Sequence, residues 1–214
     1  MYSKLQYISQ GETATAQLNN IQQALYAGCR WIQLRFKNAS EEELISIALQ
    51  VKALCAIHDA IFIINDHPQI AKAVDADGVH LGLSDMPVPK AREILGPDKI
   101  IGGTANTLED ILQRVDEVCS YVGLGPFRFT QTKEKLSPIL GVDRYQKIMS
   151  ELEKRNITTP IYAIGGIRLE DTQSIMQTGV YGVAVSGAIT THSDKKLLVE
   201  QFNSLLYEAA NNSR

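Results

Sequence analysis

The sequence predicts an α/β fold in which eight strand and helix units close into a single (β/α)8 barrel. The first observation is the steady alternation of short apolar runs with longer segments of helical spacing. The second is that the apolar runs do not alternate with polar residues, which is typical of parallel strands buried on both faces. Eight units are the number that closes a barrel, and a doubly wound open sheet is the alternative that the same pattern allows.

Four of these units occupy the first half of the chain. The first helix has apolar residues at helical spacing, and Gly28 ends it. Ser40 caps the second helix, which carries three glutamates in its first turn, where negative charge is stabilised by the helix dipole. Pro68 opens the third helix, at a position where a missing backbone N–H costs little. The expected elements are, in order, Leu5–Ile8, Ala14–Ala27, Trp31–Leu34, a helix after Ser40, Ile61–Ile64, a helix from Pro68, Gly78–Leu81 and Pro87–Leu95.

The second half of the chain repeats the pattern with one interruption. After the sixth strand, Gly125 and Pro126 end the apolar run, and a long segment without clear periodicity separates that strand from the next helix. The expected elements are Ile100–Gly103, Thr107–Val115, Tyr121–Leu124, Asp143–Arg155, Ile161–Ile164, Asp171–Thr178, Gly182–Val185 and a C-terminal helix over Lys195–Ala210.

Composition bounds the class of protein. With 214 residues, 44% of them hydrophobic and 21% charged, the chain can bury one large core, and the absence of a linker-like tract favours a single domain, 1–214. A net charge of -3 gives no basic surface for nucleic acid or an anionic membrane, so small molecules are the expected partners. The sequence leaves open whether the chain forms a homo-oligomer.

Location and redox state are also indicated by the sequence. The N-terminus lacks the apolar core of a signal peptide, and no run of about 18 apolar residues is long enough to span a bilayer. We therefore expect a soluble cytoplasmic protein. Cys29, Cys55 and Cys119 are odd in number and are not spaced as metal ligands, so they are interpreted as buried reduced thiols.

Polar residues concentrate where the predicted strands end, which in a barrel is the face that carries active sites. Thr130, Thr132 and Lys133 follow the sixth strand and suit phosphate oxygens, although an ordinary surface loop has the same composition. After the seventh and eighth strands, AIGGI and AVSGA place small residues where backbone amides can approach a phosphate. A bare pair of glycines is otherwise only a turn.

Two carboxylates end neighbouring strands, Asp66 after the third and Asp85 after the fourth. Together they suit a hard cation such as Mg²⁺, which takes few protein oxygens and leaves room for phosphate. As an alternative, the two carboxylates form a general acid and base pair. If they act separately, Asp66 is a helix cap and Asp85 is a turn residue. Arg35 and Lys37 nearby favour a site for a highly anionic ligand. His80 lies inside a strand and is interpreted as a core histidine.

Several motifs along nearly the whole chain resemble those of the thiamine-phosphate synthase family. They are QLRFK at 33–37, IND at 64–66, DGVHLGLSDMP at 77–87, GGTANT at 102–107, VGLGPFRFTQTK at 122–133, AIGGI at 163–167, and the AVSGAI run that contains Val185. The resemblance implies a Mg²⁺-dependent transferase that joins hydroxymethylpyrimidine diphosphate to a thiazole phosphate and releases diphosphate. It also implies a reaction carried by positioning and electrostatics, without a protein nucleophile.

The resemblance also implies roles for individual residues. Arg35, Lys37 and Lys133 would stabilise the leaving diphosphate, and Asp66 and Asp85 would bind Mg²⁺. The remaining members of the pyrimidine diphosphate site would be Gln33, Leu34, Phe36, Asn65 and Thr104. The thiazole phosphate site would consist of Thr130, Gln131, Thr132, Gly166, Val185 and Ser186.

Two positions depart from the family pattern. Phe36 stands where the family commonly has Glu, from which we expect altered packing or altered pyrimidine contacts. Asn106 stands where it commonly has His, and the related thiazole tautomerases use a His there for proton transfer, which Asn cannot perform. This favours the synthase over the tautomerase, while a non-catalytic phosphate sensor is a third interpretation. The segment after Pro126 is expected to act as a lid.

Overall fold

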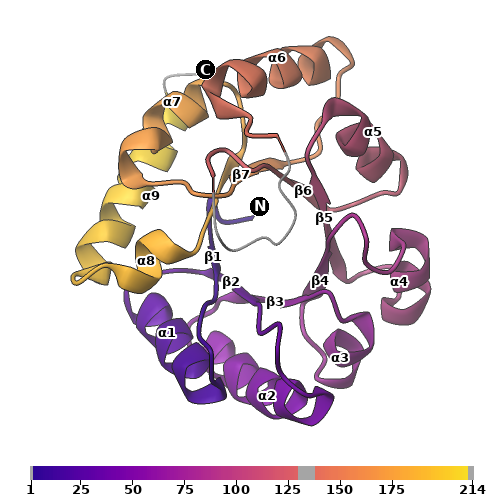
Figure 1. Ribbon diagram of the computed structural model, residues 1–214, viewed down its shortest axis with the longest axis vertical. Coiled ribbons are helices and arrows are strands. Elements are labelled where there is room, and N and C mark those ends of the chain that lie inside the picture. Colours follow the sequence, from indigo (N-terminus) through magenta and orange to yellow (C-terminus); the bar gives the residue numbers. More distant parts are fainter. Residues whose placement is uncertain (1, 130–137, 212–214) are drawn as a thin grey trace.

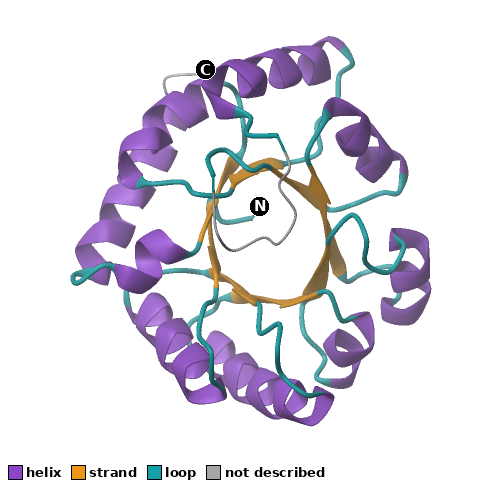
Figure 2. Cartoon of the chain, viewed as in Figure 1, coloured by secondary structure: helices purple, strands orange, loops and turns teal. Residues whose placement is uncertain are grey.

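Eight parallel strands close into one barrel inside a ring of helices in the computed structural model, which describes residues 2–129 and 138–211 (Figure 1, Figure 2). The strands pair in chain order, and β8 pairs back to β1 with Leu5 opposite Val183. Because the sheet closes on itself, the predicted barrel is confirmed and the doubly wound open sheet is excluded.

The elements follow the predicted order closely. The strands are β1 (Leu5–Ile8), β2 (Trp31–Leu34), β3 (Ile61–Asn65), β4 (Gly78–Leu81), β5 (Ile100–Ala105), β6 (Tyr121–Leu124), β7 (Ile161–Ile164) and β8 (Gly182–Val185). The helices are α1 (Ala14–Tyr26), α2 (Glu41–Ile57), α3 (Pro68–Ala73), α4 (Val88–Leu95), α5 (Leu108–Asp116), α6 (Gly141–Lys154), α7 (Thr172–Gln177), α8 (Gly187–Thr191) and α9 (Lys195–Asn211).

Four local differences from the predicted elements matter for the site. Strand β3 runs on to Asn65 and β5 to Ala105, so Asn65 and Thr104 lie within strands and not just after them. A short 3-10 turn, η1 (Leu169–Asp171), precedes α7, and the five-residue helix α8 follows β8. Neither short element was predicted, because one turn of helix is too short to show a periodicity.

Side-chain caps explain where two of the longer helices begin. The Ser40 hydroxyl accepts from the Glu43 amide, and the Glu43 carboxylate accepts from the Ser40 amide. Thr107 and Asp110 form the same reciprocal pair at the start of α5. Each pair satisfies two backbone donors that a helix start otherwise leaves open, so these helices begin where the sequence predicts.

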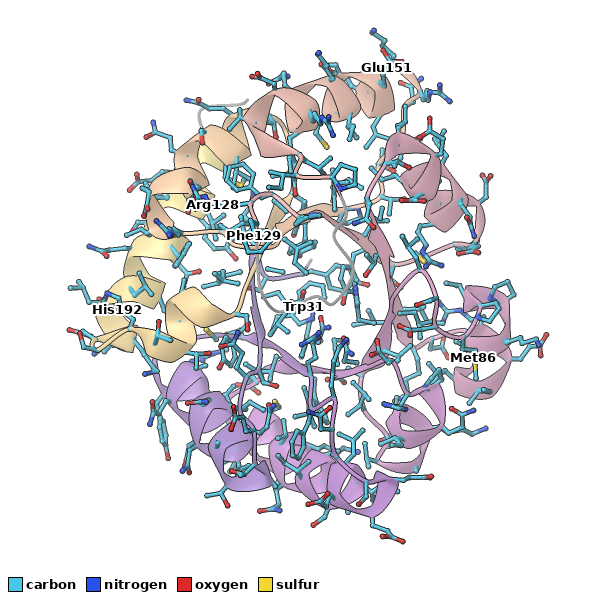
Figure 3. All side chains as sticks on the ribbon, in the orientation of Figure 1. Trp31, Met86, Arg128, Phe129, Glu151 and His192 are labelled. Atoms are coloured by element: carbon cyan, nitrogen blue, oxygen red, sulfur yellow. The ribbon has the colours of Figure 1, made fainter. Side chains whose placement is uncertain are left out.

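The core has two parts. The larger is a continuous apolar cluster, and the smaller consists of Trp31, Ile63, Tyr121 and Tyr162, all completely buried. Trp31 points into the ring of strands, whereas Glu151 and His192 lie on the outer rim (Figure 3). The Trp31 ring meets those of Tyr121 and Tyr162 edge to face, with centroids 4.9 and 5.2 Å apart. This geometry favours aromatic contact.

The N-terminal segment closes the barrel at the end where the strands begin. The Tyr162 hydroxyl donates to the Ser3 carbonyl and the Tyr181 hydroxyl to the Tyr2 carbonyl, both at 2.6 Å. Helix α9 packs against α7 and α1 and completes the outer ring (Figure 1). All three cysteines are buried and unpaired. Across residues 2–129 and 138–211, no helix is long and apolar enough to cross a membrane.

Candidate active site

A cavity of about 380 Å³ opens at the carboxyl ends of the strands. Strands β2, β3, β5, β7 and β8 bring many of the predicted site residues to its wall, and the rest of the lining includes apolar side chains such as Ile164 and Ile167. The predicted residues on this wall are Gln33, Arg35, Asn65, Thr104, Gly166, Val185 and Ser186. One cavity therefore combines residues assigned to both substrates.

A second hollow of about 290 Å³ adjoins the first, since Asn65 lines both. Its wall includes Phe36, Lys37, Asp66 and His67, from the loops that follow β2 and β3. The loop after β2 thus sends Arg35 into the main cavity and Lys37 into the side hollow. The two compartments together place cations beside carboxylates.

Asp66 and Asp85 come together as the sequence analysis expected. The pKa of Asp66 is raised to about 7, mainly by burial and then by the hydrogen bond and the charge repulsion from the Asp85 carboxyl. Lys37 and Arg35 act in the opposite direction and lower this pKa. Burial lowers the pKa of Arg35, and Asp66 partly offsets this effect. The Asp85 carboxylate also accepts from the Gly82 amide at 2.6 Å, which fixes its orientation.

This donor set fits Mg²⁺. Two adjacent carboxyls that share a hydrogen bond offer hard oxygens, and a divalent cation between them would replace the shared proton. Among residues 2–129 and 138–211, no three His, Cys, Asp or Glu side chains meet to form a complete metal cage. A two-carboxylate set suits an ion that completes its shell with water and substrate phosphate oxygens.

Gln33, which is buried, and Asn65, which is half-buried, form an amide pair that lines the cavity. The Gln33 Nε2 donates to the Asn65 Oδ1 at 2.8 Å. The Gln33 Oε1 is buried and has no hydrogen-bond partner within the described residues, although Gln33 is only 2% exposed. A buried acceptor without a donor is costly, so this oxygen is suited to receive an N–H from a ligand.

The loops after β7 and β8 form the opposite wall of the cavity. Gly165 and Gly166 have φ angles of +95° and +69°, a region that favours glycine. A side chain on Gly165 would also lie 2.8 Å from the Pro126 Cα. The Ser186 hydroxyl donates to the Ile8 carbonyl at 2.6 Å. Backbone amides in such turns are ready-made sites for anions.

A chain of buried polar groups connects the barrel interior to the cavity wall. The Gln6 Nε2 donates to the Tyr121 hydroxyl at 3.2 Å, and that hydroxyl lies 3.0 Å from the His80 Nδ1. The His80 Nε2 lies 3.0 Å from the Thr104 hydroxyl. His80 is 5% exposed, as expected for a core histidine, but its ring also lines the cavity.

The other predicted residues differ in their surroundings. The Leu34 and Phe36 side chains belong to the main apolar cluster, so Phe36 packs inward where the family commonly has a charged residue. The Asn106 Nδ2 donates to the Gly125 carbonyl at the cavity edge. The predictions for Thr130, Gln131, Thr132 and Lys133, and for the lid, fall on residues outside the described ranges and stay predictions.

Three residues near the cavity escaped the sequence analysis. Gln10 and Arg168 line the wall, and Arg128 pairs with Asp171 behind it. Gln10 follows β1, so its position after a strand was an available signal. Arg168 and Arg128 lie within or next to quoted motifs, but nothing in a single sequence separates an arginine that faces a ligand from one that pairs internally.

The closed barrel and its polar cavity at the carboxyl ends of the strands define the class: a (β/α)8-barrel enzyme. Residues 5–189 match the family described as "Thiamine monophosphate synthase". The chain therefore belongs to the thiamine monophosphate synthase family and is a transferase, which confirms the resemblance predicted from its motifs.

Individual relatives agree with this assignment. A thiamine-phosphate synthase of Flavobacterium johnsoniae is 56% identical over 97% of this chain and 98% of its own length. A thiamine-phosphate synthase of Bacteroides fragilis is 48% identical over 89% and 93% of the two chains. The structure of thiamine phosphate pyrophosphorylase from Pyrococcus furiosus superposes with a TM-score of 0.84 and 32% identity, over 96% of each chain.

Proposed function

We propose that the whole chain, residues 1–214, is one catalytic domain that joins hydroxymethylpyrimidine diphosphate to a thiazole phosphate, forming thiamine phosphate and releasing diphosphate. The observation that carries this proposal is that two different anion-binding walls face one cavity. Arg35 lies on one side, next to the adjoining hollow that Asp66 lines beside Asp85, and the Gly165–Gly166 turn with Ser186 lies on the other. A reaction between two phosphorylated substrates needs this arrangement.

The first wall suits the diphosphate. Arg35 and Lys37 carry positive charge next to the carboxyl pair, so they can neutralise the negative charge that grows as the bond between carbon and diphosphate oxygen breaks. Asp66 and Asp85 would hold Mg²⁺, which supplies further stabilisation of the diphosphate charge when it is bound. The Gln33 Oε1 is suited to accept from the amino group of the pyrimidine, which fixes the ring beside this wall.

The second wall suits the monophosphate of the thiazole. Backbone amides of the Gly165–Gly166 turn and the region after Ser186 would hold the phosphate, with the thiazole nitrogen directed at the pyrimidine methylene carbon. Bond breaking leaves that carbon as a cation, which the pyrimidine ring stabilises and the thiazole nitrogen captures with its electron pair. Apolar residues such as Ile164 and Val185 limit the access of water to the cation.

The test is to measure diphosphate release and thiamine phosphate formation from the two substrates, with Mg²⁺ and with EDTA. We expect metal-dependent product from the wild type and at least 100-fold less from Asp85→Ala, because one carboxylate alone binds the cation weakly. Asp98→Ala is the matched control, since Asp98 is exposed in the loop before β5, at the other end of the barrel. We expect it to retain wild-type activity.

Two results would contradict the proposal. Folded protein that forms no thiamine phosphate but interconverts thiazole phosphate tautomers would be a tautomerase. Folded protein that binds phosphate ligands without converting either substrate would be a sensor. The contacts of Asn106 speak against the first, since its amide donates to a carbonyl and has no group that can transfer protons at neutral pH.

A further inference from the structure

Arg128 ties together the loops that follow β6 and β7. Its guanidinium makes a bidentate ion pair with Asp171, with Nη1 donating to Oδ2 at 2.9 Å and Nη2 to Oδ1 at 2.8 Å. The same Nη1 donates to the Gly166 carbonyl at 3.1 Å. Figure 3 shows Arg128 beside Phe129 on the side of the barrel formed by β7. One side chain therefore contacts both the turn that lines the cavity and η1 behind it.

The backbone on either side of this contact fits closely. The Phe127 amide donates to the Ile164 carbonyl at 2.8 Å and the Arg128 amide to the Gly165 carbonyl at 3.0 Å, which continues the pairing of β6 with β7 past the ends of the strands. A Cβ on Gly166 would lie 3.1 Å from the Arg128 Cβ and 3.2 Å from the Phe129 carbonyl oxygen. The turn therefore packs directly against residues 128 and 129, with little room for a side chain at residue 166.

Asp171 extends the connection to the cavity wall. It is 8% exposed, and its Oδ2 also accepts from the Arg168 amide at 2.9 Å. The Arg168 side chain lines the cavity, is 65% exposed, and approaches Glu170 only to 3.7 Å. Thus the charge of Arg128 is matched by a buried carboxylate, whereas that of Arg168 lies at the cavity wall.

We propose that Arg128 is a positioning residue that holds the Gly165–Gly166 turn in the conformation that receives the phosphate of the thiazole substrate. This inference rests on the proposed function. We assign Arg128 no direct contact with the phosphate, because it does not line the cavity and its terminal nitrogens are directed at Asp171 and the Gly166 carbonyl. Arg128 sets where the backbone amides point, and precise orientation of donors is what an anion site needs.

A substitution of Arg128 should therefore change the KM values for the two substrates differently. Among the described residues, those assigned to the pyrimidine diphosphate come from β2, β3 and β5 and from the loops after β2, β3 and β4, away from the described β6 and β7 loop residues that Arg128 joins. Lys133, which is assigned to the same substrate, follows β6 and lies outside the described ranges. Arg128→Met keeps the length of the side chain but removes its charge and fork. We expect the KM for the thiazole phosphate to rise at least tenfold, while kcat and the KM for the pyrimidine diphosphate stay within twofold.

Two further variants sharpen the test. Arg128→Lys keeps the charge but cannot form the bidentate pair, so we expect only partial recovery of the thiazole phosphate KM. Arg155→Met removes an exposed arginine just after α6 and is the matched control, with all kinetic constants expected to match the wild type. Thermal unfolding of each variant measures how much of any effect is a loss of stability.

Inorganic phosphate provides a readout that does not depend on turnover. Amide NMR signals of Gly165 and Gly166 should shift on titration with phosphate in the wild type, with at least tenfold weaker affinity in Arg128→Met. A wild type without synthase activity would contradict the proposed function but leave this comparison intact. Equal changes in the KM values for the two substrates would overturn the role of Arg128. So would a lower melting temperature of Arg128→Met if its KM for the thiazole phosphate and its affinity for phosphate were unchanged.

Discussion

Strand β2 contributes to both ends of the barrel, and its two interior residues show how differently those ends are built. Trp31 and Gln33 are two residues apart, both almost completely buried, and each has one polar atom without a partner among the described residues. Around Trp31 the space is filled by Tyr121 and Tyr162. Around Gln33 the space is an open cavity. Side chains fill the barrel interior at one end, whereas at the other end they leave a cavity in which a ligand can fit.

Asp66 and Asp75 extend this comparison to charge. Both have positive φ angles, 67° and 52°, but Asp66 follows β3 and Asp75 precedes β4, so they lie at opposite ends of the barrel. Burial and Asp85 raise the pKa of Asp66 to about 7, whereas Lys99 and Lys52 lower the pKa of Asp75 to about 2. The ionised form of an aspartate is therefore destabilised beside the cavity, at Asp66, and stabilised at the other end of the barrel, at Asp75.

The largest expected effect comes from removing the destabilised carboxylate. We expect Asp66→Ala to lower kcat/KM with Mg²⁺ by about 10³-fold or more, which corresponds to about 4 kcal/mol of transition-state stabilisation. We also expect its melting temperature to stay the same or rise, because a buried repulsion is relieved. Asp75→Ala, the matched change at the other end, should keep kcat/KM within twofold. Similar losses of activity in both variants would refute the division between the two ends.

The pH dependence of Mg²⁺ binding should be the next largest effect. Because the pKa of Asp66 is raised, its carboxyl in the metal-free folded protein stays protonated up to about pH 7. The folded state therefore loses stability relative to the unfolded state as the pH rises from about 4 through 7. Mg²⁺ must displace the same proton. We therefore expect its affinity to fall up to tenfold per pH unit below about 7 and to level off above it.

This pH dependence can be measured from the rise in melting temperature with Mg²⁺ between pH 5.5 and 8.5. Lys37→Met should move the midpoint to higher pH, because Lys37 is the larger of the two cationic influences that lower the pKa of Asp66. Asp75→Asn should leave the midpoint where it is. A Mg²⁺ affinity that does not change across this pH range would contradict the role of Asp66.

Much of the fold could be predicted from the sequence, because the strands of a barrel are buried on both faces and each apolar run is closed by turn residues. Six of the eight strands have the predicted bounds, and the other two differ only by extending further. The extensions occur at Asn65 and Ala105, where polar or small residues continue the strand pairing. Pairing with a neighbour is a tertiary effect, so local pattern does not reveal it.

The candidate site was predictable to the extent that residues follow a strand end. Asp66, Asp85, Gly166 and Ser186 are positioned by that rule, since the carboxyl ends of parallel strands meet at one face. The role of Asp171 was not predictable, because it lies in a short 3-10 turn, and its partner Arg128 is 43 residues away. An internal ion pair between distant loops leaves no local pattern.

At the closed end of the barrel we expect a moderate effect on stability without an effect on catalysis. Tyr162→Phe removes the hydroxyl that donates to the Ser3 carbonyl but keeps the ring against Trp31. Loss of one buried hydrogen bond should lower the free energy of unfolding by about 1 kcal/mol, measured by urea denaturation. Both KM values and kcat should stay at the wild-type level.

The exposed Tyr26→Phe is the control for that measurement, and it should change neither stability nor activity. If Tyr162→Phe instead raised either KM with an unchanged free energy of unfolding, the closed end would be coupled to the cavity. The chain of Gln6, Tyr121 and His80 is the contact route that such coupling would follow, because it runs from the barrel interior to Thr104.

The smallest expected effect concerns Asp75 and acid stability. Lys99 and Lys52 lie 2.6 and 2.9 Å from its carboxylate and lower its pKa to about 2, below the ordinary value of about 3.9. This contribution to stability is therefore present above about pH 4 and is lost as the pH falls from about 4 to about 2. The carboxylate is exposed, so salt should screen most of the effect. Urea denaturation between pH 2.5 and 5 should show a flatter pH dependence for Asp75→Asn than for Asp98→Asn, and the difference should shrink at high salt. Equal slopes for the two variants would mean that the ion pairs at the closed end add nothing to folding, and that only aromatic packing and the tyrosine hydrogen bonds distinguish this end from the cavity.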